Sequence, residues 1–395
     1  MQSEIFRSGL DVAYLASCAL WSVVPSADEI KNIDFERLYR QASRQSMQSI
    51  VYLALKSYTE KYGNIPDALD SETYKKLERD YALHTRRAFY FDLEREKILS
   101  FMETEGIWYL PLKGIIMQNY YPQIGMRQMA DNDIHFDINH RKKLRDYMLA
   151  NGYTAVSYGQ GVHDTYTKPP FYNFEMHAYL YRESVNSIFD TYYKSVKDRI
   201  IKDESNSYGY HFSDEDFYIH TLTHIYKHYD RGGIGIRFLM DVYVYLKSKS
   251  DTLDWEYCCS ELIKLGLEDF EKKVKTLSLL LFGDPSINLK NNITSLNDEE
   301  IKELEYFIVS GIYGTKKNAV NRDVEKITGE REKTFSVKIK YLFRRLFPSM
   351  LYYKENYPFL YKYKIFIPFF VVYRMIFKAF RSRKNVVSEM KFLNE

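Results

Sequence analysis

Apolar and polar side chains alternate along two stretches in the middle of the chain, residues 126–138 and 171–180. Alternation with a period of two predicts β-strands that each turn one face to a core. The apolar faces would comprise Ile134, Phe136 and Ile138 in the first strand and Phe174, Met176, Ala178 and Leu180 in the second. The polar faces would comprise Asp131, Asp133, His135 and Asp137 in the first and Asn173, Glu175 and His177 in the second.

Apolar residues recur at steps of three and four through most of the remaining chain, which predicts helices. The predicted helices cover residues 5–21, 35–58, 72–105, 140–151, 213–230, 255–265 and 270–281. Residues 106–112 and 153–157 are predicted strands, and the turn residues of 159–170 predict a loop. The expected fold class is α+β, a small mixed sheet with helices, flanked by N-terminal and C-terminal helical regions.

These elements suggest four parts. We expect a helical N-terminal region at 1–105, an α/β core at 106–182, a helical region completing a cleft at 183–330, and a basic aromatic helical tail at 331–395.

Charge is distributed unevenly along the chain. The net charge of the 395 residues is only +3, which argues against wholesale coating of nucleic acid. The tail holds 15 Lys and Arg against 4 Glu and no Asp, so it carries +11 and the rest carries −8. Three cysteines cannot build a disulfide framework, and the N-terminus lacks a basic region before its apolar stretch. We therefore expect a cytoplasmic protein with reduced thiols.

The tail leaves several interpretations open. Its apolar run from Ile365 to Phe377 is too short to span a bilayer and contains Pro368 and Arg374. Peripheral membrane contact through residues 335–385, by an in-plane basic amphipathic helix, is one alternative. RNA binding by a basic aromatic surface is a second, less favoured one. The favoured interpretation is a helix pair packed on the core with a basic outer face.

Two carboxylates at i and i+2 on a strand, Asp131 and Asp133, lie close enough to share a cation. Hard oxygen ligands favour Mg²⁺. The alternative is a solvated strand face, and the context favours the metal site. Upstream, a strand ends in Lys113-Gly114 and a helical run follows, which is typical of a phosphate-binding corner.

Three motifs follow one another here: LPLKG, then R-x-x-x-D-x-D (Arg127, Asp131, Asp133), then E-x-H (Glu175, His177). Together they resemble the nucleotidyltransferase superfamily, which is polymerase-beta-like, and more narrowly the bacterial family of uncharacterised nucleotidyltransferases. The resemblance covers residues 100–245 strongly and the tail more loosely. Lys113-Gly114 stands where the superfamily has Gly-Ser or Gly-Gly, which bears on how the triphosphate is held.

The resemblance implies a small nucleotidyltransferase-type sheet and transfer of a nucleoside monophosphate from an NTP, such as ATP, to a hydroxyl-bearing acceptor. Two Mg²⁺ ions, with Mn²⁺ as an alternative, would be held by the catalytic carboxylates Asp131, Asp133 and Glu175. The nucleotide-binding residues would be Lys113, Gly114, Arg127, His177, His224 and Arg237. A small-molecule acceptor is favoured over a protein or an RNA end. The alternative function is a catalytically silent nucleotide-binding module whose tail docks to a membrane or a partner.

Other polar residues have less defined roles. His220, His224 and Lys227/His228 share one face of the helix that Ser213 begins. They could face the cleft, pack as hydrogen-bonded histidines, or bind zinc, although the H-E-x-x-H pattern is absent. Arg237 could bind phosphate with Asp241 orienting it, or form an ion pair with Asp241 within the helix. His163 and Asp164 could reach the site from their loop, and the role of Asp137 stays open.

Overall fold

Five strands form a mixed sheet in the order β1-β2-β5-β4-β3. They are β1 (Tyr109–Pro111), β2 (Asn132–Phe136), β3 (Thr154–Ser157), β4 (His163–Lys168) and β5 (Tyr172–His177). β2 runs parallel to β5, and the other neighbouring pairs are antiparallel. The computed structural model describes residues 4–286, 293, 296–329, 334–381 and 383–394, and within that part the α+β fold class is confirmed.

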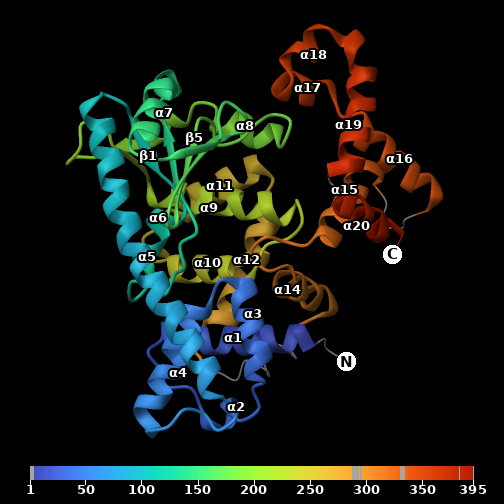
Figure 1. Cartoon of the computed structure of the whole chain (residues 1–395). Coiled ribbons are helices and arrows are strands. Elements are labelled where there is room, and N and C mark those ends of the chain that lie inside the picture. The colour runs from blue at the N-terminus through green and yellow to red at the C-terminus, as the bar shows by residue number, and fades with distance from the viewer. Residues whose placement is uncertain (1–3, 287–292, 294–295, 330–333, 382, 395) are drawn as a thin grey trace.

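The long helix α5 (Ser71–Thr104) runs the length of the molecule and covers one side of the sheet (Figure 1). It begins at Ser71, one residue before the predicted start, and its N-cap is Asp70, whose carboxylate accepts from the Thr73 amide. The remaining helices of the N-terminal region are α1 (Glu4–Leu20), α2 (Ala27–Ile30), α3 (Phe35–Gln45) and α4 (Gln48–Tyr62). Ser46, at φ 52°, ends α3 and divides the predicted 35–58 stretch into two helices.

Two strand predictions need correction. The predicted loop 159–170 contains β4, where Asp164 and Tyr166 are buried and alternate with residues that face the other side of the sheet. Polar residues occupy both faces of β4, so the alternation of hydrophobicity that identifies a strand is missing. β2 ends at Phe136, because the Asp137 carboxylate accepts from the Asn139 amide and caps the 3₁₀ turn η2 (Ile138–His140). Ala178 and Leu180 likewise follow β5 rather than belong to it.

The segment 183–330 is not wholly helical, because β6 (Ile200–Lys202) and β7 (Tyr210–Phe212) form a two-stranded ribbon beside β1. The helices around the sheet and in this segment are α6 (Gly114–Met117), α7 (Arg141–Ala150), α8 (Ser187–Tyr193), α9 (Asp214–Tyr229), α10 (Ile236–Lys249), α11 (Trp255–Leu265), α12 (Glu268–Phe282), α14 (Asp298–Ser310) and α15 (Lys316–Thr328), with 3₁₀ turns η1 (Gln118–Tyr120) and η3 (Val196–Asp198).

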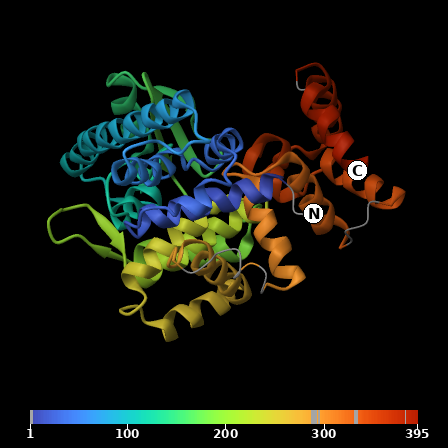
Figure 2. The same cartoon turned by 90° about the horizontal axis from the view of Figure 1, so that it is seen from below.

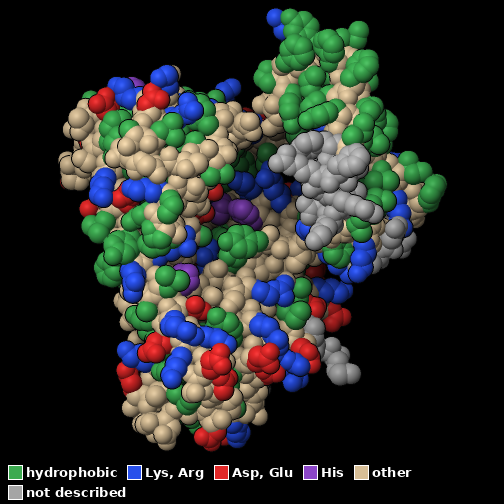
Figure 3. All heavy atoms as spheres, viewed as in Figure 1, with side chains coloured by type: hydrophobic (Ala, Val, Ile, Leu, Met, Phe, Trp, Pro, Cys, Tyr) green, Lys and Arg blue, Asp and Glu red, His purple; other side chains and the backbone are tan. Residues whose placement is uncertain are grey.

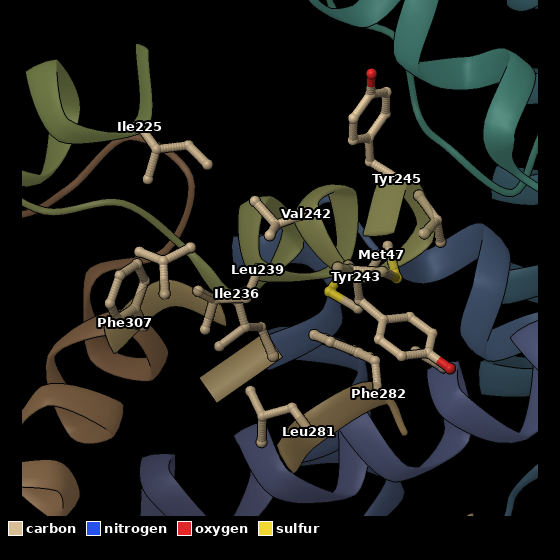
Figure 4. Packing of buried hydrophobic residues seen from close by; sticks show 14 of the residues in the cluster. Met47, Ile225, Ile236, Leu239, Val242, Tyr243, Tyr245, Leu281, Phe282 and Phe307 are labelled. Atoms are coloured by element: carbon tan, nitrogen blue, oxygen red, sulfur yellow. The ribbon is translucent and has the colours of Figure 1, made fainter. Parts of the chain in front are cut away.

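Two separate cores position the site. One lies between α5, the sheet and α7 and includes Phe91, Ile134, Phe136, Phe174 and Met176, so the predicted apolar faces are confirmed for these four strand residues. Leu180 packs in the other core instead, and Ile138 is only partly buried. The other packs the N-terminal helices against α9, α10, α12 and α14. Figure 4 shows α10 at its centre, with side chains of α4's N-terminus, α12 and α14 around it.

The tail forms α16 (Phe335–Leu346), α17 (Met350–Asn356), α18 (Pro358–Lys362), η4 (Lys364–Phe366), α19 (Ile367–Arg381) and α20 (Arg383–Asn394). Together with α15 it builds a small third cluster around Val320, Val324, Val337 and Tyr341. It projects from one side of the body in both views (Figures 1 and 2). The predicted boundary at 330–331 lies outside the described residues.

None of the helices in the described ranges is long and apolar enough to cross a lipid bilayer.

Candidate active site

The sheet register brings together carboxylates that lie far apart in the sequence. Asp133 of β2 is paired with Glu175 of the parallel strand β5, so both side chains point to the same face. On the other side of β5, Thr165 of β4 is paired with Glu175 and His163 with His177. The side chains of Asp133, His163, Glu175 and His177 therefore form one polar patch on one side of the sheet. His135, Asp137 and Asn173, which the predicted polar faces also included, do not line the pocket described below.

This patch lies at the base of a pocket of about 410 Å³ between the sheet and α9 and α10. Figure 3 shows the hollow in this face of the molecule, with Lys, Arg and His side chains inside it. All nine residues that the sequence nominated line it: Lys113, Gly114, Arg127, Asp131, Asp133, Glu175, His177, His224 and Arg237. The structure thus brings every nominated residue to one place, and their roles stay predictions.

Asp133 is the most heavily contacted of the three carboxylates. Its Oδ1 accepts from Lys113 Nζ at 2.6 Å and lies 2.7 Å from His177 Nε2. The Nδ1 atom of the neighbouring His135 lies 2.7 Å from the His177 carbonyl oxygen, so His135 ties β2 to β5 rather than facing a ligand. Burial raises the pKa of Asp133, but Lys113 and His177 outweigh it and hold that pKa well below its usual range.

Asp131 and Glu175 are less well compensated. Burial first, and then the neighbouring carboxylates Asp133 and Asp131, raise the pKa of Glu175 to about 8. Burial and the charge of Asp133 also raise the pKa of Asp131. Two acidic groups with raised pKa values beside a third that is ionised are typical of a site that gains stability from an added cation.

The Lys113-Gly114 corner differs in detail from the prediction. α6 is a single turn, continued by η1, so the dipole of a long helix does not contribute there. Lys113 adopts φ 49° and ψ −114°, an unusual conformation for a residue with a Cβ. A Cβ on Gly114 would lie 2.6 Å from Arg127 Nη1, so the glycine makes room for that guanidinium.

Asp241 has a different partner from the one predicted. Its carboxylate accepts from Arg127 Nε at 2.8 Å and Nη2 at 3.0 Å, and from the Tyr121 hydroxyl at 2.7 Å. Arg237 instead donates from Nη1 to the Gln128 carbonyl oxygen at 2.9 Å. The prediction of an intrahelical ion pair between Arg237 and Asp241 is therefore wrong, because Arg127 donates to both carboxylate oxygens of Asp241. Burial and the charge of Arg127 lower the pKa of Arg237.

The family model described as "Uncharacterised nucleotidyltransferase" matches residues 31–283, well over half of the chain. The chain belongs to this family. No curated protein matches the chain. No solved structure matches it. Membership supports nucleotidyl transfer as the general function and an NTP as a substrate. The matched segment contains the whole five-stranded sheet and the two helices, α9 and α10, that line the pocket.

The histidine face of α9 divides into two parts. His224 and His228 line the pocket, and their Nε2 atoms lie 3.1 Å apart. His220 is buried against Phe212 and Tyr193 and is absent from the pocket lining. Burial, together with the positive charges of Lys113 and Lys227, lowers the pKa of His224 and His228. The histidines are therefore neutral at pH 7.

His163 and Asp164, which we expected could reach the site from a loop, point to opposite sides of β4. His163 lines the pocket, with Nδ1 3.3 Å from Glu175 Oε2. Asp164 is turned away and binds Arg141 through two contacts of 2.7 Å. The prediction that both could reach the site is thus correct for His163 and wrong for Asp164, because neighbouring strand residues face opposite sides.

Two overlapping sets of side chains could hold a metal ion. The ligand atoms of His163, Glu175 and His177 lie within 4.8 Å of one another. The predicted set of Asp131, Asp133 and Glu175 lines the same pocket and shares Glu175 with the first. The carboxylate set suits Mg²⁺ or Mn²⁺, whereas a set with two imidazoles suits softer ions such as Zn²⁺.

Sequence reasoning missed the outer wall of the pocket. Phe238 of α10 and Ile312 and Tyr313, from the loop between α14 and α15, line it. Tyr313 is 87% exposed, although backbone hydrogen bonds hold its loop on each side. The Ile312 amide donates to the Arg44 carbonyl oxygen, and the Thr315 amide donates to the Gly232 carbonyl oxygen. The only available signal was the G-I-Y-G sequence of 311–314, in which two glycines flank an aromatic residue.

Proposed function

We propose that the protein is a Mg²⁺-dependent nucleotidyltransferase that transfers an NMP from an NTP to a hydroxyl-bearing acceptor, with a small molecule as the favoured acceptor. The observation that supports it is the register pairing of Asp133 with Glu175 in a pocket that also contains Asp131. The family of the chain points to the same general reaction.

Asp131, Asp133 and Glu175 would hold the metal ions. Their fit is supported by the raised pKa of Asp131 and Glu175, which reflects burial first and then the negative charge of the neighbouring carboxylates. When bound, divalent ions would neutralise the phosphate charge and polarise the α-phosphate.

The cationic side chains of the pocket would orient the triphosphate. Lys113, Lys227 and Arg237 all line it. Burial and the charge of Lys113 lower the pKa of Lys227 to about 8, so an added polyphosphate would raise its protonated fraction at neutral pH. Asp241 engages Nε and Nη2 of Arg127, and Met129 Sδ accepts from Nη1, so Arg127 would mainly position the pocket wall and contribute charge.

The acceptor hydroxyl would attack the α-phosphorus, the bond to the β-phosphate oxygen would break, and pyrophosphate would leave. Glu175 would help to take the proton of the hydroxyl, as a carboxylate that lies beside Asp133 and lines the pocket. His163, 3.3 Å from Glu175, would keep the glutamate oriented. Catalysis would come mainly from positioning and charge stabilisation.

The test uses the purified full-length chain with Mg²⁺ and each NTP in turn. A first assay measures binding of a non-hydrolysable NTP analogue by calorimetry, with and without chelator. A second measures pyrophosphate release across a panel of hydroxyl-bearing acceptors. We expect metal-dependent binding, and release with at least one acceptor. Unchanged release by Asp133→Asn would overturn the assignment of the carboxylates.

One observation favours a second function, a catalytically silent nucleotide-binding module. Lys113 Nζ lies 2.6 Å from Asp133 Oδ1. Its ammonium group therefore neutralises the carboxylate charge that a metal ion would otherwise neutralise. Analogue binding that chelator does not weaken, combined with no pyrophosphate release from any acceptor, is the result expected of this module.

A further inference from the structure

The tail exposes large hydrophobic side chains at a density unlike the rest of the molecule. About half of the exposed large hydrophobic side chains among the described residues lie between Phe335 and Met390, about a seventh of the chain. Figure 3 shows them as green areas over the projecting helices. Isolated exposed hydrophobic residues are ordinary, but a cluster of this size marks a surface that binds something.

The cluster is ordered by helical spacing on α18, η4 and α19. Phe359, Ile365, Phe366, Phe369, Val372 and Ile376 form what we call the tail tip. The Phe359 and Phe366 rings lie 5.6 Å apart, and Ile365, Phe369, Val372 and Ile376 follow one another at steps of four, three and four. Ile365 is 75% and Phe369 71% exposed, whereas Val371, on the other face of α19, is buried.

Exposed lysines are interleaved with this apolar surface. Lys362 and Lys364 alternate with Tyr361 and Tyr363 and are exposed. No acidic residue occurs in the sequence between Glu355 and Glu389. The tip therefore combines protruding apolar side chains with uncompensated positive charge, while residues 1–330 carry a net negative charge of −8.

We propose that the tail tip docks the protein on the surface of an anionic lipid bilayer. Apolar side chains would enter the interface, the tyrosines would lie at headgroup depth, and the lysines would contact lipid phosphates. The same positive charge on both partners would repel a second copy of this surface. Nucleic acid offers stacking and phosphate contacts but no partner for aliphatic Ile365, Val372 and Ile376.

The experiment measures co-sedimentation of the full-length chain with phosphatidylcholine vesicles and with vesicles of phosphatidylcholine and phosphatidylglycerol in equal amounts. We expect partition to the anionic vesicles that weakens as salt is added, and little partition to the neutral ones. The double variant Ile365→Ser/Phe369→Ser should lower the partition coefficient about tenfold or more. Lys362→Glu/Lys364→Glu should lower it by a similar factor.

Matched controls lie on the body. Val156 and Ile263 are 65% and 61% exposed, and Val156→Ser/Ile263→Ser should leave partition unchanged. Lys61→Glu/Lys302→Glu changes the net charge equally and should have only a small effect. Absence of partition to anionic vesicles overturns the proposal, and so does equal loss in tip and body variants. Tip-dependent binding of single-stranded RNA or tip-dependent dimerisation, without vesicle binding, also overturns it. The assay needs no nucleotide, so it is independent of the proposed transfer activity.

Discussion

Lys113 and His177 both contact Oδ1 of Asp133, whereas Glu175, on the neighbouring strand, forms no ion pair with a lysine among the described residues. Burial raises the pKa of both carboxyl groups, and the unequal distribution of positive charge explains why the pKa of Asp133 nevertheless falls while that of Glu175 rises. The two neighbours therefore differ in chemistry although their residue types are similar. One is a carboxylate that stays ionised at all relevant pH values, and the other is a group that can exchange a proton near neutrality.

Removing either carboxylate should abolish transfer without unfolding the chain. We expect Asp133→Asn and Glu175→Gln to lower the rate of pyrophosphate release by about a thousandfold or more, because positioning and charge stabilisation supply most of the catalysis. Asp137→Asn is the matched control, since Asp137 lies outside the pocket lining and asparagine also caps η2. Loss of activity in the Asp137 variant would contradict the assignment.

Stability of the metal-free protein should depend on pH through Glu175. Its pKa is about 8 in the fold against 4.5 in the unfolded chain, so the fold favours the protonated form. The stabilisation is complete below about pH 4.5 and is lost as pH rises through about 8. In chelator, we expect the Tm to fall between about pH 5 and pH 8, and to fall less in Glu175→Gln. An identical slope in wild type and variant would contradict this.

Elements with one dominant pattern could be predicted from the sequence, and elements set by distant contacts could not. β2, β5, α5 and α9 follow from alternation, helical spacing and caps. β4 could not be found because Asp164 and His163 make both its faces polar, and Asp164 is buried only because Arg141 pairs with it. The partner of Asp241 depends on tertiary packing of α10 against the segment before β2, which no local pattern encodes.

The ion pair between α10 and that segment should be a major structural contact. Arg127 and Asp241 are both buried, and removal of one partner leaves an unpaired charge. We expect Asp241→Ala to lower the free energy of unfolding by about 3–5 kcal/mol. By contrast, Asp146→Ala, which removes the exposed ion pair with Lys142, should change it by less than about 1 kcal/mol. Urea unfolding of both variants measures the difference, and equal effects would contradict the prediction.

At the scale of the whole molecule, the family-matched region does not complete the pocket. The match ends at residue 283, whereas Ile312 and Tyr313 line the pocket from a later loop. Their placement could not be predicted, because it depends on amide–carbonyl bonds to Arg44 and Gly232, far away in the sequence. We expect this loop to contribute to nucleotide affinity, with the exposed Tyr313 ring as a platform for the base.

Tyr313→Ala should raise the Kd for a non-hydrolysable NTP analogue, since base stacking on an aromatic ring contributes about 1–3 kcal/mol. That corresponds to a factor of about five to a hundred and fifty. Tyr313→Phe keeps the ring and should bind normally. Tyr62→Ala removes another exposed tyrosine, at the end of α4, and should have no effect. Equal Kd values for Tyr313→Ala and wild type, measured by calorimetry, would exclude the platform.

Tyr313 lies three residues before the start of α15, the helix that packs against the tail. The rim of the pocket and the root of the tail are thus one continuous piece of backbone, held to Gly232 by the Thr315 amide. A tilt of the tail would therefore displace the rim of the pocket. We therefore expect contacts at the far end of the tail to affect the orientation of the pocket rim.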